Sequence, residues 1–449
     1  MKQNIYQQII TDIEEDISGQ RYKPGKKLPS VRDLSEKYQC SKNTVVKAFE
    51  MLKNRHILYS VPQSGYYIVE NLLRNETTDS PVIDFSTGNP TIGTIHSPDL
   101  KHCLDRAVDI YKNTSLDHSL YGVDSLRNIL PDYLADSQVF TNIDNIFVAQ
   151  GIQQMLSILT QMPFPNGNDA ILIEQPTYRY FIDFLKSFGV RLIGIPRNES
   201  GVDLNQLETI FKTAKIKFFY TIPRNHNPLG TSYPKIQRKA IAALAAKYNV
   251  YIVEDDYFGD IVFDRRSDPI YADGDHYHHI YLKNYSKIIP WIQIGLAVVP
   301  EHLLVVLKQH LASSYYDSYF SPSLVSQATL EIYIRSNLLK KHTSAIKKEL
   351  QERLKCLKKC CCRFQQYGIQ FCGGSGFYSF LKLPEAIAEE ELVETLKKKQ
   401  VLVAAGRPFY FDNSYYQKGI RISIAHTDCQ SIERGAAIIG TEIAEALNK

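Results

Sequence analysis

Short apolar segments alternate with helical stretches from residue 82 onward, and this alternation restricts the fold of the chain more than any other feature. The candidate strands are NIFVA (145–149), AILI (170–173), RLIGI (191–195), FFYT (218–221), VYIVE (250–254) and IYLK (280–283). Strands that alternate with helices form a mostly parallel sheet covered by helices. We therefore predict an α/β unit with a mostly parallel central sheet. In such sheets ligands bind beyond the carboxyl ends of the strands.

Groups that can bind a ligand follow five of these strands. They are a Gln-Gly helix start that contains Ile152 and Gln153, the ring of Tyr178, Asn227 in an Asn-Pro-Leu-Gly turn, Asp255 and Tyr257 in EDDY, and Lys287 in NYSK. Free amides at a helix start can bind phosphate. Each motif is weak by itself, since EDDY is more often a solvated loop and NPLG a simple turn. Their shared position at strand ends predicts one common site.

Lys287 stands in the apolar stretch KNYSKIIPWIQIG, residues 283–295. A lysine usually avoids such surroundings, because burial removes the hydration of its charge. A lysine that forms a Schiff base benefits from them, because desolvation frees the amine as a nucleophile. The position therefore indicates a reactive lysine.

Length and composition set the broad class of the protein. A chain of 449 residues, 44% of them apolar and 22% charged, is expected to fold into two or three globular domains. No apolar run approaches the ~18 residues of a membrane span, and the first residues lack the apolar core of a signal peptide. We expect a cytoplasmic protein that does not bind membranes. The cysteines around Cys356–Cys362 and the histidines around His276–His279 lack zinc-ligand spacing, so no metal site is predicted.

The first seventy residues predict a winged helix–turn–helix. Isoleucines at helical spacing open the chain, a second helix starts at Pro29-Ser30, and a third runs through TVVKAFEMLKNRH. Two β-prone runs around a Pro-Gln-Ser-Gly turn then form a hairpin. Residues 21–55 contain ten lysines and arginines but only three acidic residues, although the whole chain carries a net charge of only +4. Such a local excess is typical of a surface that binds a polyanion.

The segment PGKKLPSVRDLSEKYQCSKNTVVKAFEML, followed by SGYYIV, resembles the DNA-binding domain of the GntR family. The resemblance implies binding to double-stranded operator DNA, with the start of the third helix in the major groove and the hairpin tip near the minor groove. Hydroxyl and lysine side chains at a helix start suit phosphate oxygens and base edges. The residues implied in DNA binding are Arg32, Ser41, Lys42, Thr44, Lys47 and Gly65. The alternative is a small helical domain with a solvated basic face.

The domain boundaries follow from these patterns. We expect a DNA-binding domain over residues 1–70 and a flexible linker over 71–81, where NLLRNETTDSP lacks periodicity and would span on the order of 20 Å. Residues 82–449 are expected to form the second domain. Its large part would cover about 110–320, and its small part 82–109 and 321–449.

The order of motifs from residue 82 resembles fold-type I pyridoxal-phosphate enzymes of the aspartate aminotransferase superfamily. The resemblance implies pyridoxal 5'-phosphate as cofactor and Lys287 as the Schiff-base lysine. Asp255 would pair with the protonated pyridine nitrogen, which makes the ring an electron sink. Tyr257 and Asn227 would bind the 3-oxygen of the ring, and Tyr178 would stack on its face.

The same resemblance implies which residues bind the phosphate of the cofactor and which bind the carboxylate of an effector. Ile152, through its backbone, and Gln153 would hold the phosphate. Tyr121, in LYGVDSLR, would reach the phosphate of the neighbouring subunit, which implies a homodimer with shared sites. Arg421, in GIRISIAH, would bind the carboxylate of an amino acid. Further cofactor-binding positions that the resemblance implies are Asn284, Ser286 and Gln293.

The sequence departs from the superfamily pattern next to the lysine. Relatives carry a Pro-Gly-Leu-Arg segment whose arginine binds the phosphate, whereas this chain has Pro290-Trp291-Ile292-Gln293, and Asn284 stands in place of a serine. A charged hydrogen bond contributes about 1.5–3 kcal/mol against about 1 kcal/mol for a neutral one. We therefore expect about tenfold weaker cofactor binding. Lys283 or Arg179 could supply the missing charge.

A GntR-like domain ahead of an aminotransferase-like domain is the arrangement of MocR-type regulators. The resemblance implies a transcription regulator that uses pyridoxal phosphate to sense an amino acid, an amine or the vitamer itself. Its enzymatic turnover is expected to be inefficient, with half-reactions at most. One alternative is a working aminotransferase with an accessory DNA-binding domain. The other is a regulator whose large domain has lost the cofactor.

Overall fold

The computed structural model describes residues 4–19, 21–23, 25–69, 82–90, 97–113, 120–264, 267–317 and 322–448. The chain divides into two compact units, Met1–Pro81 and Val82–Lys449. The predicted linker over 71–81 lies outside the described residues. No described helix combines the length and the apolar character that a membrane span requires.

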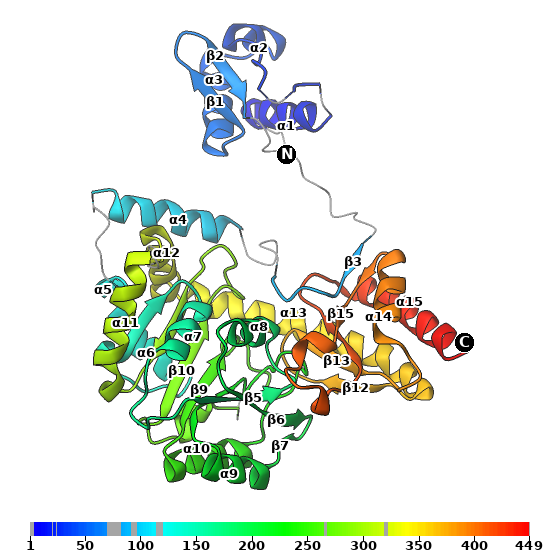
Figure 1. Ribbon diagram of the computed structural model, residues 1–449. Helices are drawn as coiled ribbons and strands as arrows, with labels where there is room; N and C mark the ends of the chain where they lie inside the picture. The colour runs from blue at the N-terminus through cyan, green and yellow to red at the C-terminus, as the bar shows by residue number, and fades with distance from the viewer. Residues whose placement is uncertain are drawn as a thin grey trace. The chain divides into compact units, whose positions relative to one another are not determined.

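The N-terminal unit has the predicted order of a winged helix–turn–helix (Figure 1). Its elements are α1 (Ile5–Ser18), α2 (Val31–Lys37), α3 (Lys42–Asn54), β1 (Leu58–Val61) and β2 (Gly65–Ile68). The two strands pair in antiparallel register, with Val61 opposite Gly65 at the tip. Isoleucines of α1 pack with Val45, Phe49 and Leu52 of α3 in one apolar core. The periodicity seen in the sequence therefore marks the buried helix faces.

The C-terminal unit contains an eight-stranded central sheet in its described residues. Its order is β4-β11-β10-β9-β8-β5-β6-β7. The strands are β4 (Ile146–Ala149), β5 (Ala170–Gln175), β6 (Leu192–Asn198), β7 (Gly201–Val202), β8 (Ile216–Thr221), β9 (Tyr251–Asp256), β10 (His279–Asn284) and β11 (Gly295–Val298). All six predicted strands are present and run in one direction, because β10, β9, β8, β5 and β6 pair in parallel and β11 pairs in antiparallel fashion with both β10 and β4. The prediction of a mostly parallel sheet is confirmed.

Helices cover the central sheet and a second, smaller sheet (Figure 1). The helices of this unit are α4 (Ser97–Tyr111), α5 (Asp124–Arg127), α6 (Leu130–Ala135), α7 (Ile152–Gln161), α8 (Arg179–Ser187), α9 (Leu204–Thr213), α10 (Lys235–Tyr248), α11 (Leu304–Asp317), α12 (Leu324–Arg335), α13 (Leu338–Cys361), α14 (Glu389–Lys398) and α15 (Cys429–Leu447). The small sheet has the order β12-β13-β16-β15. Its strands are β12 (Gln370–Gly373), β13 (Tyr378–Lys382), β15 (Ala404–Ala405) and β16 (Gly419–Ser423).

The described chain enters this unit through the short strand β3 (Ile83–Asp84), which pairs in parallel with β14 (Val401–Leu402). Beyond β3, the backbone of Phe85 bonds Leu402 and Ser423, so the entering segment lies against the small sheet. It then continues toward the carboxyl ends of the central strands. This path brings residues 86–89 to the cavity described next.

Candidate functional site

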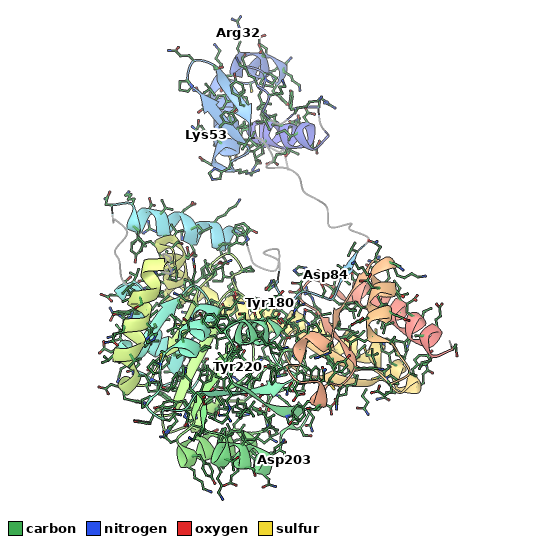
Figure 2. All side chains as sticks on the ribbon, viewed as in Figure 1. Arg32, Lys53, Asp84, Tyr180, Asp203 and Tyr220 are labelled. Carbon is green, nitrogen blue, oxygen red and sulfur yellow. The ribbon has the colours of Figure 1, made fainter. Side chains whose placement is uncertain are left out.

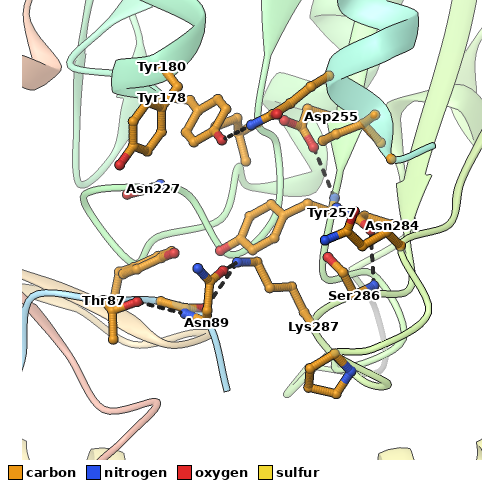
Figure 3. A pocket seen from close by; sticks show the side chains of 18 of the residues that line it. Thr87, Asn89, Tyr178, Tyr180, Asn227, Asp255, Tyr257, Asn284, Ser286 and Lys287 are labelled. Atoms are coloured by element: carbon orange, nitrogen blue, oxygen red, sulfur yellow. Dashed lines mark hydrogen bonds between the residues drawn. The ribbon is translucent and has the colours of Figure 1, made fainter. Parts of the chain in front are cut away.

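A cavity of about 740 Å³ lies beyond the carboxyl ends of the central strands (Figure 3). Eleven residues that the sequence assigned to the cofactor or the effector line it: Ile152, Gln153, Tyr178, Asn227, Asp255, Tyr257, Asn284, Ser286, Lys287, Gln293 and Arg421. Tyr121 does not line the cavity of its own chain and instead packs against Phe147. The structure thus brings the assigned residues of this chain together, while their roles stay a prediction.

Lys287 lies on the loop between β10 and β11. Its Nζ donates hydrogen bonds to the backbone oxygen of Gly88 at 3.0 Å and to Oδ1 of Asn89 at 2.6 Å (Figure 3). The loop is shaped locally by Asn284, whose Oδ1 accepts a bond from the amide of Ser286 at 3.0 Å. The amine therefore projects into the cavity and toward the segment that enters from β3.

Asp255 is the second-to-last residue of strand β9 and is buried. Its carboxylate accepts bonds from the Tyr220 hydroxyl at 2.6 Å and from the Tyr257 amide at 3.1 Å, both neutral donors. Burial raises the pKa of the Asp255 carboxyl to about 7, although these bonds oppose the rise. Such a carboxylate gains from a cation placed beside it.

The next residue, Asp256, lies on the other face of the strand, as the alternation of side chains requires. It pairs with the buried guanidinium of Arg224 and accepts a bond from the Tyr281 hydroxyl at 2.6 Å. Burial acts to raise the pKa of Asp256, but the Arg224 guanidinium outweighs it and holds that pKa below its usual value. Of the two aspartates in EDDY, only Asp255 lines the cavity.

Two tyrosines that line the cavity with Asp255 have hydrogen-bond partners. The Tyr257 hydroxyl donates to the backbone oxygen of Asn225 at 2.7 Å, and burial raises the pKa of this phenol well above its usual value. The hydroxyl of Tyr178 accepts a bond from Nε2 of Gln153 at 2.7 Å (Figure 3). The ring of Tyr178 is thereby fixed at the cavity edge.

The start of α7 forms one end of the cavity. Gly151 precedes the helix with a φ of +80°, and a side chain at Gly295 would lie 2.6 Å from the backbone of Gly151. Gly295 thus lets the backbone of β11 approach the start of α7 closely, and Gly151 allows the positive φ of the turn before the helix. The first amides of α7 have no partner within the helix. Free amides of this kind bind anions.

Lysine and arginine side chains are scarce around this helix start. Lys287 and Arg421 are the two that line the cavity among the described residues. Lys283 is buried and its Nζ lies 2.8 Å from Oδ1 of Asp260. Arg179 is half exposed and pairs with Asp183. The suggestion that Lys283 or Arg179 replaces the missing phosphate arginine therefore gains no support from their positions.

Arg421 reaches the cavity from β16 of the small sheet. Its Nη1 donates to Oδ1 of Asn227 at 3.2 Å, and Nη2 donates to the backbone oxygen of Ser86. The guanidinium lies over the rings of Tyr378 and Phe409, at 4.6 and 5.1 Å from their centres. Its Nε is buried and has no hydrogen-bond partner in the described part of the chain. An arginine with donors to spare suits a carboxylate.

Sequence reasoning missed the segment 86–89 and the tyrosines around it. Ser86, Thr87, Gly88, Asn89 and Tyr378 all line the cavity. One signal was present, since STGNP combines Gly and Pro with polar residues and directly follows a short apolar run. A side chain at Gly88 would lie 1.8 Å from the Tyr378 hydroxyl, so glycine is required there. That requirement arises from a distant strand and is invisible in local sequence.

The N-terminal unit presents the residues assigned to DNA. Ser41 caps α3 by accepting a bond from the Thr44 amide at 3.2 Å, and its Oγ also lies 2.9 Å from Oγ1 of Thr44. Lys42 is exposed in the first turn of α3. Arg32 extends outward from α2, with its side chain 77% exposed (Figure 2). These side chains are available to a polyanion.

The two remaining positions are placed differently. The ammonium of Lys47 lies 4.5 Å from the ring centre of Tyr6 on α1, although the residue is exposed. Gly65 has a φ of +127° at the tip of the hairpin, and a side chain there would contact Cε of Lys27. The hairpin tip is thus close to a lysine that the sequence did not single out.

Two families match this chain. Aminotransferase class I and II matches residues 80–439, and the gntR family of bacterial regulatory proteins matches residues 5–68. The uncharacterized HTH-type transcriptional regulator YcxD of Bacillus subtilis (strain 168) is 38% identical, over 97% of this chain and 98% of its own. The uncharacterized HTH-type transcriptional regulator YjiR of Escherichia coli (strain K12) is 24% identical, over 98% and 99% of the two chains.

Solved structures resemble the C-terminal unit in fold. The kynurenine aminotransferase of Pyrococcus horikoshii superposes with a TM-score of 0.75 at 24% identity, over 82% of this chain and 92% of the enzyme. The multiple substrate aminotransferase of Thermococcus profundus gives a TM-score of 0.74 at 22% identity, over 83% and 93%. These likenesses establish the fold of residues 82–449.

Proposed function

Because this chain belongs to the aminotransferase class I and II family, and to the MocR-type regulators that join such a domain to a gntR-family reader, we propose that it is a DNA-binding transcription regulator. Its C-terminal unit would bind pyridoxal 5'-phosphate and sense an amino acid, an amine or the vitamer. The observation that carries the proposal is the convergence of Lys287, Asp255 and Arg421 on one cavity. A match to HTH-type regulators along the whole chain supports the DNA-binding part.

The donor set of the cavity fits the cofactor. Asp255 is a buried carboxylate whose hydrogen-bond donors among the described residues are all neutral, so a protonated pyridine nitrogen would supply the missing cation. Lys287 offers an amine at the cavity wall, and the ring of Tyr178 lies at its edge. The free amides of α7 at Ile152, together with Gln153, would hold the phosphate. When bound, pyridoxal phosphate supplies an aldehyde for amines and an electron-withdrawing ring.

The side chains of this chain have separate tasks in such a site. Lys287 would hold the cofactor covalently and return to an amine when an effector amine takes its place. Arg421 would orient an effector through its carboxylate, because a guanidinium binds that group with two parallel bonds. Tyr257 and Asn227 would bind the ring oxygen. Tyr121, which does not line the cavity of its own chain, would serve the site of the partner subunit in a homodimer.

The phosphate end of the site predicts weak retention of the cofactor. We expect the change Gln293→Arg to tighten binding of pyridoxal phosphate about tenfold, since it restores a charged hydrogen bond. Gln293→Met, of similar size but neutral, is expected to bind no better than the original chain. Affinity is measured by titrating the visible absorbance. Equal affinity for the arginine and methionine variants would contradict the assignment of Gln293 to the phosphate.

The N-terminal unit is expected to bind operator DNA through Arg32, Lys42 and Thr44. Replacing Lys42 by alanine should reduce the slope of log affinity against log salt by about 0.9, because one phosphate contact and its released counterion are lost. Lys53→Ala is the matched control, because Lys53 lies at the other end of α3 and pairs with Glu50 (Figure 2). Footprinting on promoter fragments locates the site. If the full protein protects none of them, the regulator proposal fails.

A working aminotransferase is the second candidate function, and the joint presence of Lys287, Asp255 and Arg421 in the cavity favours it. The deciding experiment titrates pyridoxal phosphate and amino acids while operator affinity and dimer shape are followed, the latter by X-ray scattering. A regulator changes its affinity or its shape with occupancy, since only a differential interaction shifts a conformational equilibrium. If operator affinity and dimer shape both stay constant, and amino acids and keto acids interconvert at ordinary enzyme rates, the protein is a working aminotransferase.

A third reading is a regulator whose C-terminal unit has lost the cofactor, and the neutral Gln293 and Asn284 are its support. A visible absorbance that borohydride bleaches would exclude this reading. A purified protein that stays colourless with added pyridoxal phosphate would favour it.

A further inference from the structure

The loop Phe85–Asn89, called here the cavity loop, supplies both hydrogen-bond acceptors that Lys287 has within the described part of the chain. These are the backbone oxygen of Gly88 and Oδ1 of Asn89, at 3.0 and 2.6 Å. The lysine extends from the central sheet, whereas the loop follows β3 along the small sheet. The two bonds therefore join the central-sheet side of the unit to a loop held from the opposite side.

The small-sheet side holds the cavity loop through other contacts. The amide of Ser423 donates to the backbone oxygen of Phe85 at 2.9 Å, and Arg421 donates to the backbone oxygen of Ser86. Nε2 of His426 contacts the backbone oxygen of Asn89. These contacts do not involve the lysine amine, so they can persist when Lys287 changes its chemistry.

Covalent attachment of an aldehyde to Lys287 removes the protons that these bonds use. Condensation of the neutral amine forms one carbon–nitrogen double bond and releases one water, which carries both amine hydrogens and the aldehyde oxygen. The product nitrogen holds at most one proton, gained from solvent. A nitrogen with one proton cannot donate fully to both Gly88 and Asn89. At least one of the two hydrogen bonds, to Gly88 or to Asn89, is therefore lost when Lys287 is loaded, that is, when the cofactor is attached to it covalently.

From this stoichiometry we propose that the cavity loop is an internal ligand of Lys287 that pyridoxal phosphate displaces. Loading then removes at least one of the two bonds that hold the loop on its central-sheet side and leaves the contacts with the small-sheet side in place. The loop follows β3, and β3 follows the residues that connect the chain to the DNA-binding unit. Attachment of the cofactor to Lys287 thereby changes the contacts of the part of the C-terminal unit that comes first along the chain after the DNA-binding unit. This inference rests on the proposed function, since it requires that Lys287 carries the cofactor.

Substitutions at Asn89 give opposite results if the proposal is correct. Asn89→Ala removes a competitor for the lysine, so the full-length protein should bind pyridoxal phosphate about three- to tenfold more tightly, the range for a partly exposed bond to a charged group. Asn89→Asp keeps the shape but adds a negative charge beside the amine, which strengthens the internal contact and should weaken binding. Lys247→Ala is the control, because this exposed lysine on α10 pairs with Glu208 and does not line the cavity. It should change affinity less than about twofold.

Hydrogen exchange of the peptide that covers residues 82–90 is the second measurement. Its amides should exchange faster after wild-type protein is loaded with pyridoxal phosphate. In Lys287→Ala they should exchange fast without cofactor, and addition of cofactor should change nothing. If Asn89→Ala weakens binding as Asn89→Asp does, the asparagine serves the cofactor and the proposal is wrong. Exchange that loading leaves unaltered in the wild type also overturns it.

The two measurements separate this inference from the proposed function. A wild-type protein that gains no visible absorbance contradicts cofactor binding itself. The comparison of exchange between Lys287→Ala and wild type, both without cofactor, still shows whether the lysine holds the loop. Normal absorbance together with equal exchange in these two proteins refutes the internal-ligand proposal alone.

Discussion

Protein with Lys287 replaced by alanine is expected to remain colourless in the presence of pyridoxal phosphate and to keep its fold. The lysine amine is the group that would bond the cofactor covalently. Among the described residues it forms two hydrogen bonds, both to the cavity loop. Losing these partly exposed bonds costs on the order of 1–3 kcal/mol, which an ordinary domain tolerates. The loss of the visible absorbance should be complete.

The measurement compares visible spectra before and after borohydride reduction, with X-ray scattering to check that the variant keeps the size and shape of the wild-type protein. Lys247→Ala is the control, because this exposed lysine on α10 pairs with Glu208 and does not line the cavity. It should leave the absorbance unchanged. A visible band that persists in Lys287→Ala and disappears in another lysine variant would show that the assignment of the reactive lysine is wrong.

Asp255→Asn is expected to stabilise the cofactor-free protein while weakening cofactor binding about ten- to hundredfold. Burial raises the pKa of Asp255 to about 7 in the folded chain, from an ordinary value of 3.8. A raised pKa means that the folded state binds the proton more strongly than the unfolded state. The free energy of unfolding therefore falls as pH rises from about 4 to about 7. Asparagine cannot ionise, so the Asp255→Asn variant avoids this decrease in the free energy of unfolding, which is about 2–4 kcal/mol at pH 8.

The weaker cofactor binding has the same origin. A buried carboxylate without a cationic partner destabilises the cofactor-free protein. A protonated ring nitrogen offsets this cost when the cofactor binds, through a charged hydrogen bond worth about 1.5–3 kcal/mol. Urea unfolding at pH 5 and pH 8, without cofactor, measures the first effect. An absorbance titration measures the second. Lower stability of the asparagine variant at pH 8 would contradict the account.

The neighbouring aspartate provides a control with the opposite sign. Asp256→Asn leaves the buried Arg224 guanidinium without its full partner, which should cost about 3–5 kcal/mol. Cofactor affinity should change little, because Asp256 does not line the cavity. Two adjacent carboxylates are thus expected to respond in opposite directions to the same substitution.

The sequence was sufficient to predict the architecture, because strands and their ends leave local signals. Apolar runs mark β4, β5, β6, β8, β9 and β10, and residues that follow five of them line the cavity. The prediction of both families, and of the regulator arrangement that joins them, is confirmed. The assignment of individual roles at the site stays a prediction, since position in the cavity does not identify the bound group.

Other features depend on contacts that local sequence does not record. The cavity loop reaches Lys287 only because β3 pairs with β14, more than three hundred residues away in the chain. The sequence allowed Lys283 to be a phosphate ligand, yet its pairing with Asp260 is set by how the segment after β9 folds back. Strand β11 was not predicted, and it runs antiparallel because residues 285–294 are too few for the crossover that a parallel strand requires.

That tight return from β10 to β11 has a mechanical consequence. Both ends of the turn that carries Lys287 are fixed in the interior of the sheet, with Asn284 opposite Gly295 in the ladder. A short segment held at both ends is stiff, so the backbone at Lys287, only three residues after Asn284, has a nearly constant position. The backbone of Lys287 is therefore expected to stay in place while the segments in contact with its side chain move. When the cofactor attaches to Lys287, the displacement is expected in the cavity loop, which contacts the lysine. The size of that displacement depends on how flexible the loop is.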